Sequence, residues 1–388
     1  MRKRATNKRA VRSKLNEFAS VAKAFDGFRP ARDVLSVVRA VPTCFVQFDH
    51  ATKVGGLPIE RFMLIHGPSG EGKTYCTLGL LDSFLELGHL AYLVDAERTT
   101  PITWARTVMK HADHPHFFAD RPSTYEETTA SVRKFVLNVK RLRDAGKLPD
   151  DASALVVVDS LKKLVPKNIW DKIVQDAAKN GIDGVGGAAG RLKAALNAQW
   201  MDELVPLLEE TGTAFIAIAR EREDPDADKW DKLAGRDFKV GGGTAIYYDS
   251  SLVMRVERAG YVQEKGDDPT AKAKIYGERH RITIRKTKVA GQEEKQTQCY
   301  FHTSNGTISP PGFDRSRDVL ELAEKFGVIE KKGAWYSHNG QRLGQGIHNT
   351  VARVADDDDL LENIEQATRA KFAENAPTEF DGETGEVA

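Results

Sequence analysis

Short apolar runs and longer amphipathic stretches alternate through the middle of the chain. The stretches at about 74–88, 124–146 and 188–210 repeat their apolar residues at helical spacing. Between them lie four apolar runs, which are FMLIH at 62–66, LAYLV at 90–94, ALVVV at 154–158 and TAFIAIA at 213–219. Apolar strands separated by helices are typical of a parallel sheet covered on both faces. We therefore expect an α/β fold whose core has a mostly parallel central sheet.

The pattern changes on either side of this core. Residues 251–258 and 280–288 alternate apolar and polar side chains, which predicts half-buried, antiparallel strands. Residues 15–28 have helical spacing, and TCFVQF at 43–48 predicts a strand. SPPG at 309–312 marks a boundary before a small α+β part. The expected domains are 1–54, a basic arm and an N-terminal helix and strand segment; 55–308, the core; 309–370, a small α+β C-terminal domain; and 371–388, an acidic tail.

Composition narrows the class of protein. The chain has 388 residues with a net charge of +1, and no apolar run is long enough to span a bilayer or to act as a secretory signal. Cys44, Cys76 and Cys299 form no disulfide or metal-ligand pattern. We therefore expect a cytoplasmic protein with no membrane partner.

The two ends of the chain carry opposite charge. Residues 1–14 hold seven Lys or Arg and no acid, whereas residues 371–388 hold five acids and one lysine. Both segments read as solvated tails. In a second interpretation the basic arm attracts a polyanion and the acidic tail competes with it.

The segment GPSGEGKT at 67–74 fits the phosphate-loop pattern G-x-x-x-x-G-K-[ST] between a predicted strand and a predicted helix. Glycines let the backbone N–H groups surround a phosphate, and the next helix adds its N-terminus. Lys73 is expected to reach the β and γ phosphates of ATP, and Thr74 to hold Mg²⁺. The predicted nucleotide-binding residues here are Gly67, Pro68, Ser69, Gly70, Glu71, Gly72, Lys73, Thr74 and Tyr75.

Acidic residues follow two of the apolar runs. Asp159 ends ALVVVD, where ligands bind in an open α/β sheet, so we expect it to share the metal site with Thr74. Asp95 and Glu97 follow LAYLV, and Glu97 is the predicted general base for hydrolysis. The alternatives are a capping role for Asp159 and a solvated strand-end acid at Glu97.

An ordered series of segments resembles the bacterial RecA recombinases. The series runs from about residue 15 to 370 and comprises GGLP at 55–58, the phosphate loop, VDAE at 94–97, PITWAR at 101–106, VVVDS at 156–160, GGGTAIYY at 241–248, IRKTKVA at 284–290 and GAWYSHNGQRLGQG at 333–346. The resemblance implies a RecA-like phosphate-loop NTPase core. It also implies a recombinase that forms helical filaments on single-stranded DNA, exchanges strands with homologous double-stranded DNA and hydrolyses ATP between subunits.

The resemblance also assigns residues. It places Trp104 against the adenine, and Lys286 and Lys288 at the γ-phosphate of a neighbouring subunit. Together with Lys73 and Glu97, these two lysines complete the expected catalytic set. Two ammonium groups on one face of a strand repel each other unless an anion lies there. The alternatives are a buried core aromatic at Trp104 and a solvated edge strand at the lysines.

Two loops are expected to hold DNA, one at 180–191 and one at 220–243. Both are long, rich in glycine and poor in apolar anchors, which is also compatible with merely flexible insertions. Cations there can meet phosphates, and Trp230 and Phe238 can stack on bases. The predicted DNA-binding residues are Gly190, Arg191, Arg220, Arg222, Lys229, Trp230, Lys232, Arg236, Phe238, Lys239, Gly241 and Gly242.

The chain departs from the family at two points, and other functions stay open. Arg220 stands where the family has a glutamine that senses the γ-phosphate, and the second loop contains several acids. One alternative is a RecA-fold DNA motor, either a ring helicase or a branch-migration ATPase. Another is a DNA-binding scaffold or regulator with a weak ATPase. The N-terminal segment 1–54 is expected to pack on a neighbouring subunit, and single-strand-binding and mediator proteins are further candidate partners.

Overall fold

The computed structural model describes residues 38–177, 188–230, 238–241, 244–264, 273–289 and 297–374. Several sequence predictions lie outside the described residues. They are the basic arm, the helix at 15–28, the first loop through residue 187, Lys232, Arg236, Gly242 and the tail from residue 375.

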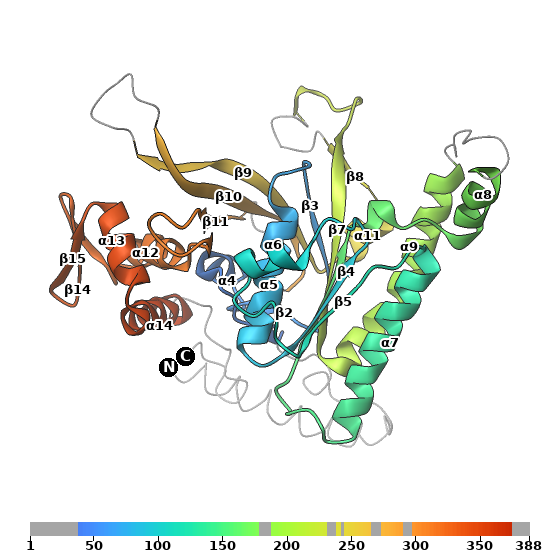
Figure 1. Cartoon of the computed structure of the whole chain (residues 1–388), viewed down its shortest axis with the longest axis horizontal. Helices are drawn as coiled ribbons and strands as arrows, with labels where there is room; N and C mark the ends of the chain where they lie inside the picture. Colours follow the sequence, from blue (N-terminus) through green and yellow to red (C-terminus); the bar gives the residue numbers. More distant parts are fainter. Residues whose placement is uncertain are drawn as a thin grey trace, which may run out of the picture. The chain divides into compact units, whose positions relative to one another are not determined.

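A ten-stranded sheet dominates the described part of the chain (Figure 1). Its order is β12-β11-β10-β9-β3-β7-β6-β4-β5, with β8 paired to β7. The strands from β9 to β5 in this order are parallel, whereas β9, β10, β11 and β12 pair antiparallel. The bounds are β3 Phe62–Gly67, β4 Leu90–Asp95, β5 Phe117–Asp120, β6 Ala154–Asp159, β7 Thr213–Glu223, β8 Phe238–Val240, β9 Leu252–Glu264, β10 Lys274–Thr287, β11 Thr297–Ser304 and β12 Gly312–Phe313. The predicted α/β fold and the antiparallel strands after residue 250 are confirmed.

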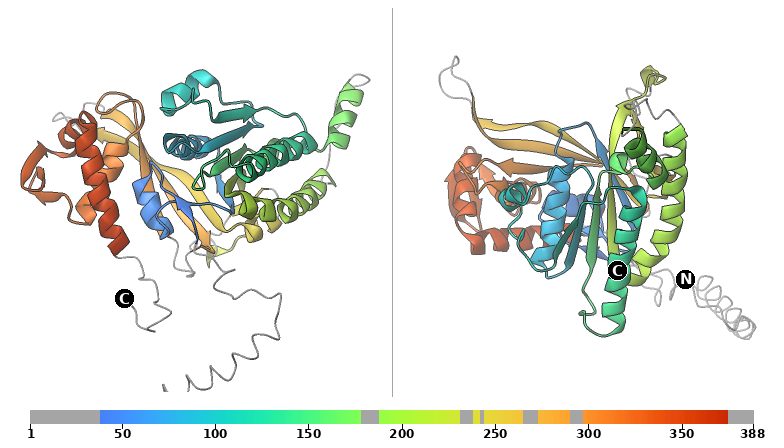
Figure 2. Two further views of the ribbon diagram at one scale, coloured as in Figure 1. Left: turned by 90° about the horizontal axis from the view of Figure 1, so that it is seen from below. Right: turned by 45° about the vertical axis from the view of Figure 1, so that its right-hand side comes forward.

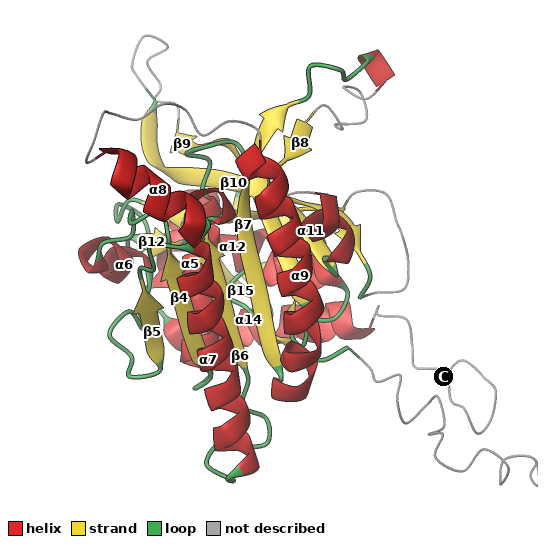
Figure 3. Cartoon of the chain, turned by 90° about the vertical axis from the view of Figure 1, so that its right-hand side faces the viewer, coloured by secondary structure: helices red, strands yellow, loops and turns green. Residues whose placement is uncertain are grey.

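Helices cover both faces of this sheet because successive strand side chains point to opposite sides. Met63 and Ile65 of β3 join one apolar cluster, and Phe62 and Leu64 join the other. The first cluster includes α5 (Lys73–Glu86) and α6 (Ile102–Val108), and the second includes α7 (Tyr125–Asp144), α9 (Ala188–Thr211) and α11 (Thr244–Asp249). The right-hand view of Figure 2 shows the sheet between α5 and the pair α7 and α9, and Figure 3 shows α7 and α9 in front of the sheet, running lengthwise along its strands. The segments η2 (Leu161–Lys163) and α8 (Lys167–Ala177) follow β6.

Local capping explains where one of the long helices begins. The amide of Glu127 donates to Thr124 Oγ1 at 3.2 Å, and the amide of Thr124 donates to Glu127 Oε2 at 3.3 Å. Each side chain therefore satisfies a backbone N–H group that the first turn of α7 would leave unpaired. Thr124 and Glu127 thus form a capping box.

The predicted strand at 43–48 is wrong, because this segment leads into helix α4 (Val46–Thr52). Asp49 accepts hydrogen bonds from the amide of Thr43 at 2.8 Å and from its hydroxyl at 2.7 Å, which folds the chain back on itself. Phe45, Val46 and Phe48 are buried, so the apolar run fills a core instead of a sheet. On either side, β1 (Ala40–Val41) pairs with β2 (Leu57–Pro58).

The C-terminal part is built on a third apolar cluster, formed largely by Val319, Val351, Val354 and Ile364 and joined by Val46 of α4. Its elements are α12 Arg315–Lys325, β13 Glu330–Lys332, β14 Trp335–His338, β15 Gln341–Gln345, α13 Ile347–Ala355 and α14 Asp358–Glu374. The expected small α+β domain is confirmed. Among the described helices, none is long and apolar enough to cross a membrane.

Candidate functional site

The turn between β3 and α5 depends on glycine at two positions. Gly67 has a φ of +150° and Gly72 a φ of +95°, which side chains rarely tolerate. A Cβ on Gly67 would lie 2.1 Å from the carbonyl oxygen of Val256, and one on Gly72 would lie 2.6 Å from Nδ1 of His280. The backbone can therefore follow this path only without side chains, and the helix that follows presents unpaired N–H groups suited to a phosphate.

The first residues of α5 meet the end of β6. Lys73 is buried, its ammonium donates to the carbonyl of Pro68, and burial lowers its pKa. Thr74 Oγ1 donates to Asp159 Oδ2 at 2.5 Å. Burial raises the pKa of Asp159 to about 6, although the hydrogen bond from Thr74 opposes the rise. The structure thus brings together the two residues predicted to share a metal.

These two side chains fit Mg²⁺, which prefers oxygen ligands and keeps several waters. Thr74 offers a hydroxyl oxygen and Asp159 a carboxylate oxygen. Across the described residues, no group of three His, Cys, Asp or Glu side chains could hold a metal ion. Phosphate oxygens and water would therefore complete the coordination.

The two acids after β4 take different places. The strand ends at Asp95, whose carboxylate accepts from the amides of Thr99 and Thr100 and pairs with Arg121 at 2.9 Å. Asp95 thus shapes the turn that follows. Glu97 lies in that turn and lines a pocket together with Lys73 and Thr74.

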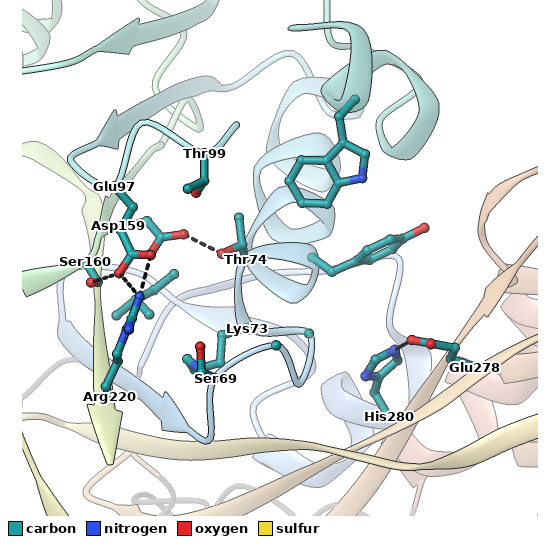
Figure 4. A pocket seen from close by; sticks show the side chains of 15 residues that line it. Ser69, Lys73, Thr74, Glu97, Thr99, Asp159, Ser160, Arg220, Glu278 and His280 are labelled. Atoms are coloured by element: carbon teal, nitrogen blue, oxygen red, sulfur yellow. Dashed lines mark hydrogen bonds and ion pairs between the residues drawn. The ribbon is translucent and has the colours of Figure 1, made fainter. Parts of the chain in front are cut away.

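Glu97 is held by three neighbours. Its Oε1 accepts from Ser160 Oγ at 2.5 Å, and one terminal nitrogen of Arg220 lies 3.1 Å from Oε1 and 3.0 Å from Oε2. Its amide donates to the carbonyl of Asp159 at 3.0 Å. Burial alone would raise the pKa of Glu97, but the hydrogen bonds from Ser160 and Arg220 lower it below its ordinary value. The carboxylate is therefore charged and fully engaged (Figure 4).

A pocket of about 340 Å³ connects these groups. Trp104 and Tyr75 line its other side, with ring centroids 6.1 Å apart. Below them, Glu278 lies 3.2 Å from Nε2 of His280, whose ring stacks on Phe301 at 4.7 Å. The aromatic side suits a base, and the side with Lys73 suits phosphates.

Some pocket residues were not predicted from the sequence, namely Thr99, Ser160, Ile218, Glu278 and His280. Ser160 directly follows Asp159, so the rule that ligands bind beyond strand ends could have identified it. Glu278 and His280 are two residues apart in β10 and share a face, but no local motif marks them.

Lys286 and Lys288 lie together, as the alternation of strand side chains predicts. The ammonium of Lys286 donates to the carbonyls of Tyr247 at 3.0 Å and Tyr248 at 2.6 Å, and that of Lys288 donates to Tyr248 at 2.8 Å. Both therefore bind the end of α11. They are not among the residues that line the pocket of their own chain.

The residues predicted to bind DNA fall into two groups. In the first group, Arg222, Lys229 and Trp230 are exposed, with Trp230 74% accessible. Gly190 and Arg191 lie in α9, and Gly241 follows β8. Others have partners within the chain. The ring centroid of Phe238 lies 5.1 Å from that of His66 and 5.3 Å from the guanidinium carbons of both Arg255 and Arg285. Lys239 pairs with Asp224 at 2.7 Å and with Asp226 at 3.3 Å.

A phosphate loop, a strand-end Asp and a carboxylate at the carboxyl edge of a parallel sheet define the class of phosphate-loop nucleotide-binding proteins. Comparison with known proteins narrows the class. The family model of the RecA N-terminal domain matches residues 30–304, and the family model of the RecA C-terminal domain matches residues 317–373. The chain therefore belongs to the RecA family.

Curated relatives align with this chain over most of its length. Protein RecA of Syntrophus aciditrophicus is 26% identical over 342 residues, covering 88% of this chain and 87% of the relative. Protein RecA of Clostridium tetani is 28% identical over 335 residues, covering 86% and 83%. Protein RecA of Frankia alni is 27% identical over 361 residues, covering 92% and 91%. Family membership supports a RecA-type recombinase in DNA recombination and repair that binds ATP and DNA.

Proposed function

We propose that this chain is an ATP-dependent homologous recombinase that forms helical filaments on single-stranded DNA and exchanges strands with homologous double-stranded DNA. The supporting observation is that Lys73, Glu97 and the Thr74–Asp159 pair line one pocket at the carboxyl edge of the parallel sheet. The matches to both RecA domains add that this pocket belongs to a chain with the whole family architecture.

In this proposal the phosphate loop holds ATP, and Trp104 stacks on its base. Lys73 binds the β and γ phosphates and stabilises the charge that develops as the terminal phosphoryl group leaves. Glu97 takes a proton from water, whose oxygen attacks the γ-phosphorus while ADP departs. Thr74 and Asp159 would hold Mg²⁺, which supplies charge neutralisation when bound.

Lys286 and Lys288 act between subunits in the proposed filament. Neither lines its own pocket, and both bind the last turn of α11, which directly follows the second loop. An anion on a neighbouring subunit would draw both ammonium groups, as an arginine finger is drawn to a phosphate. ATP binding and DNA binding would therefore both favour closure of the same interface.

The exposed Arg222, Lys229 and Trp230 of the second loop support a role in holding the single strand. Cations bind backbone phosphates, and an aromatic ring stacks on bases without strong sequence preference. Homology would then be read by base pairing with the incoming duplex.

The decisive experiment is strand exchange between a homologous single strand and duplex, with and without ATP. We expect exchange that needs ATP and homology. Glu97→Gln should still bind ATP and form filaments, but its turnover should fall by about 10²-fold or more. Absence of exchange in the wild type, together with normal ATP binding, would contradict the recombinase assignment.

Electron microscopy separates this proposal from a ring motor. Open filaments on DNA support a recombinase, whereas closed rings support a helicase or branch-migration ATPase. The Arg220–Glu97 ion pair gives the scaffold alternative its one structural argument, because it occupies the proposed base. DNA-stimulated ATP turnover would exclude that alternative.

A further inference from the structure

Arg220 forms an ion pair with Glu97, the carboxylate that the proposed hydrolysis requires as a general base. Its side chain is 33% accessible and that of Glu97 is 15% accessible, so the pair is partly shielded from water. Oε1 of Glu97 accepts from Ser160 and Arg220, and Oε2 accepts from Arg220. A general base must present an oxygen to the proton it removes. In this arrangement Glu97 directs its carboxylate toward the guanidinium.

The same arginine is tied to the hairpin formed by β7 and β8. Its carbonyl accepts from the amide of Gly241 at 2.9 Å. The next residue, Glu221, is opposite Val240 in the register and binds Arg255 at 2.8 Å and His66 at 3.1 Å. A movement of the hairpin base therefore moves the backbone of Arg220.

The hairpin also carries cations that a polyanion would attract. Lys239 is 62% accessible and at present is paired with Asp224 and Asp226, while Arg222 is exposed. DNA phosphates compete with those carboxylates for the cations. Arg222 lies two residues from Arg220 in β7, and Lys239 is opposite Arg222 in the register, so this competition acts close to Arg220.

We propose that Arg220 is a positioning residue that holds Glu97 away from the reacting water until single-stranded DNA engages the β7–β8 hairpin. The inference rests on the proposed function. A second anion is at hand to receive the released guanidinium, because Arg220 lines the same pocket as Lys73 and would face the terminal phosphate of ATP there. Release therefore exchanges one charged partner for another.

Turnover without DNA is the first test. Arg220→Gln keeps a polar side chain of similar reach but removes the charge. Arg353→Gln removes the same charge from an exposed position of α13 and is the matched control. Loss of a charge-assisted hydrogen bond shifts an equilibrium by about tenfold. We expect Arg220→Gln to raise kcat without DNA by about tenfold at nearly unchanged KM for ATP. Arg353→Gln should keep the wild-type kcat, and saturating oligo(dT) should bring the kcat of Arg220→Gln close to that of the wild type.

DNA affinity is the second test, and it needs no hydrolysis. If DNA binding must break the pair, then a chain without the pair binds DNA more tightly, by linkage. Glu97→Gln should bind labelled oligo(dT) about tenfold more tightly, measured by fluorescence anisotropy with a non-hydrolysable ATP analogue. Glu362→Gln, which removes the same charge from the exposed face of α14, is the matched control and should bind like wild type.

The outcomes are distinguishable. If Arg220→Gln leaves DNA-free kcat unchanged or lowers it, or if Glu97→Gln binds DNA no more tightly, the positioning role is overturned while the recombinase proposal stands. If the wild type neither binds oligo(dT) nor increases its turnover with it, the proposed function fails and the inference fails with it.

Discussion

The nucleotide pocket and the β7–β8 hairpin lie at the same edge of the sheet but are organised differently. Backbone shape builds the pocket: Gly67 and Gly72 admit a path that no side chain would allow, and Thr74 already meets Asp159. In the hairpin, cations are held by acids of the same chain, as Lys239 is by Asp224. The pocket is therefore preformed for its ligand, whereas the hairpin is neutralised internally. The loop of the first already has the shape that a phosphate needs, whereas DNA must displace the acids that now hold Lys239 at the second.

Lys73→Ala should have the largest effect, because it removes the charge at the centre of the preformed pocket. We expect ATP turnover to fall to the uncatalysed background, with nucleotide binding weakened as well. DNA-stimulated phosphate release and equilibrium nucleotide binding measure this. Lys134→Ala, at an exposed position of α7, should keep wild-type values. Retained DNA-stimulated turnover in Lys73→Ala would show that the pocket is not the ATPase site.

The Lys286→Ala, Lys288→Ala double variant should come next, because it removes both ammonium groups from the end of α11. We expect DNA-stimulated turnover to fall by about 10³-fold, at the lower end of an arginine-finger effect. Nucleotide binding to isolated subunits should not change, since neither lysine lines its own pocket. Lys274→Ala, at the other end of β10, is the control. Normal turnover in the double variant would remove the cross-subunit role.

The same contrast explains what could be predicted from the sequence. The sheet and phosphate loop follow from local patterns, because apolar runs form buried strands and glycines mark the turn. The pairing of Arg220 with Glu97 joins residues 123 positions apart, and no local pattern encodes it. Helix α4 was missed because Asp49, not apolar spacing, sets its geometry. Phe238 was expected on bases, but its present neighbours come from three other strands.

Two aromatic variants sharpen the comparison within the hairpin. Trp230 is exposed, so Trp230→Ala should lower affinity for oligo(dT) by about tenfold without changing stability. Phe238 packs against His66, Arg255 and Arg285, so Phe238→Ala should lower the free energy of unfolding by about 1–2 kcal/mol. Anisotropy and urea unfolding on both variants measure this. The contrast fails if Trp230→Ala is the less stable variant and Phe238→Ala loses only DNA affinity.

The smallest expected effect is on stability and concerns Glu221, at the base of the β7–β8 hairpin. Burial would raise the pKa of Glu221, but hydrogen bonds with His66 and Arg255 outweigh it and lower the pKa from 4.5 to about 2. Because the folded-state value is the lower one, Glu221 stabilises the fold fully above about pH 4.5 and loses this contribution as pH falls toward 2. Glu221→Gln should therefore be less stable near pH 7 by on the order of 1 kcal/mol, since partial access to water weakens the interaction.

The difference in free energy of unfolding between wild type and Glu221→Gln should shrink when urea unfolding is repeated at successively lower pH below 4.5. Glu223→Gln removes an equal charge two residues farther along β7, where the side chain is exposed, and should show no such convergence. A constant difference between wild type and Glu221→Gln down to pH 3 would mean that hydrogen-bond geometry, not charge, anchors the hairpin.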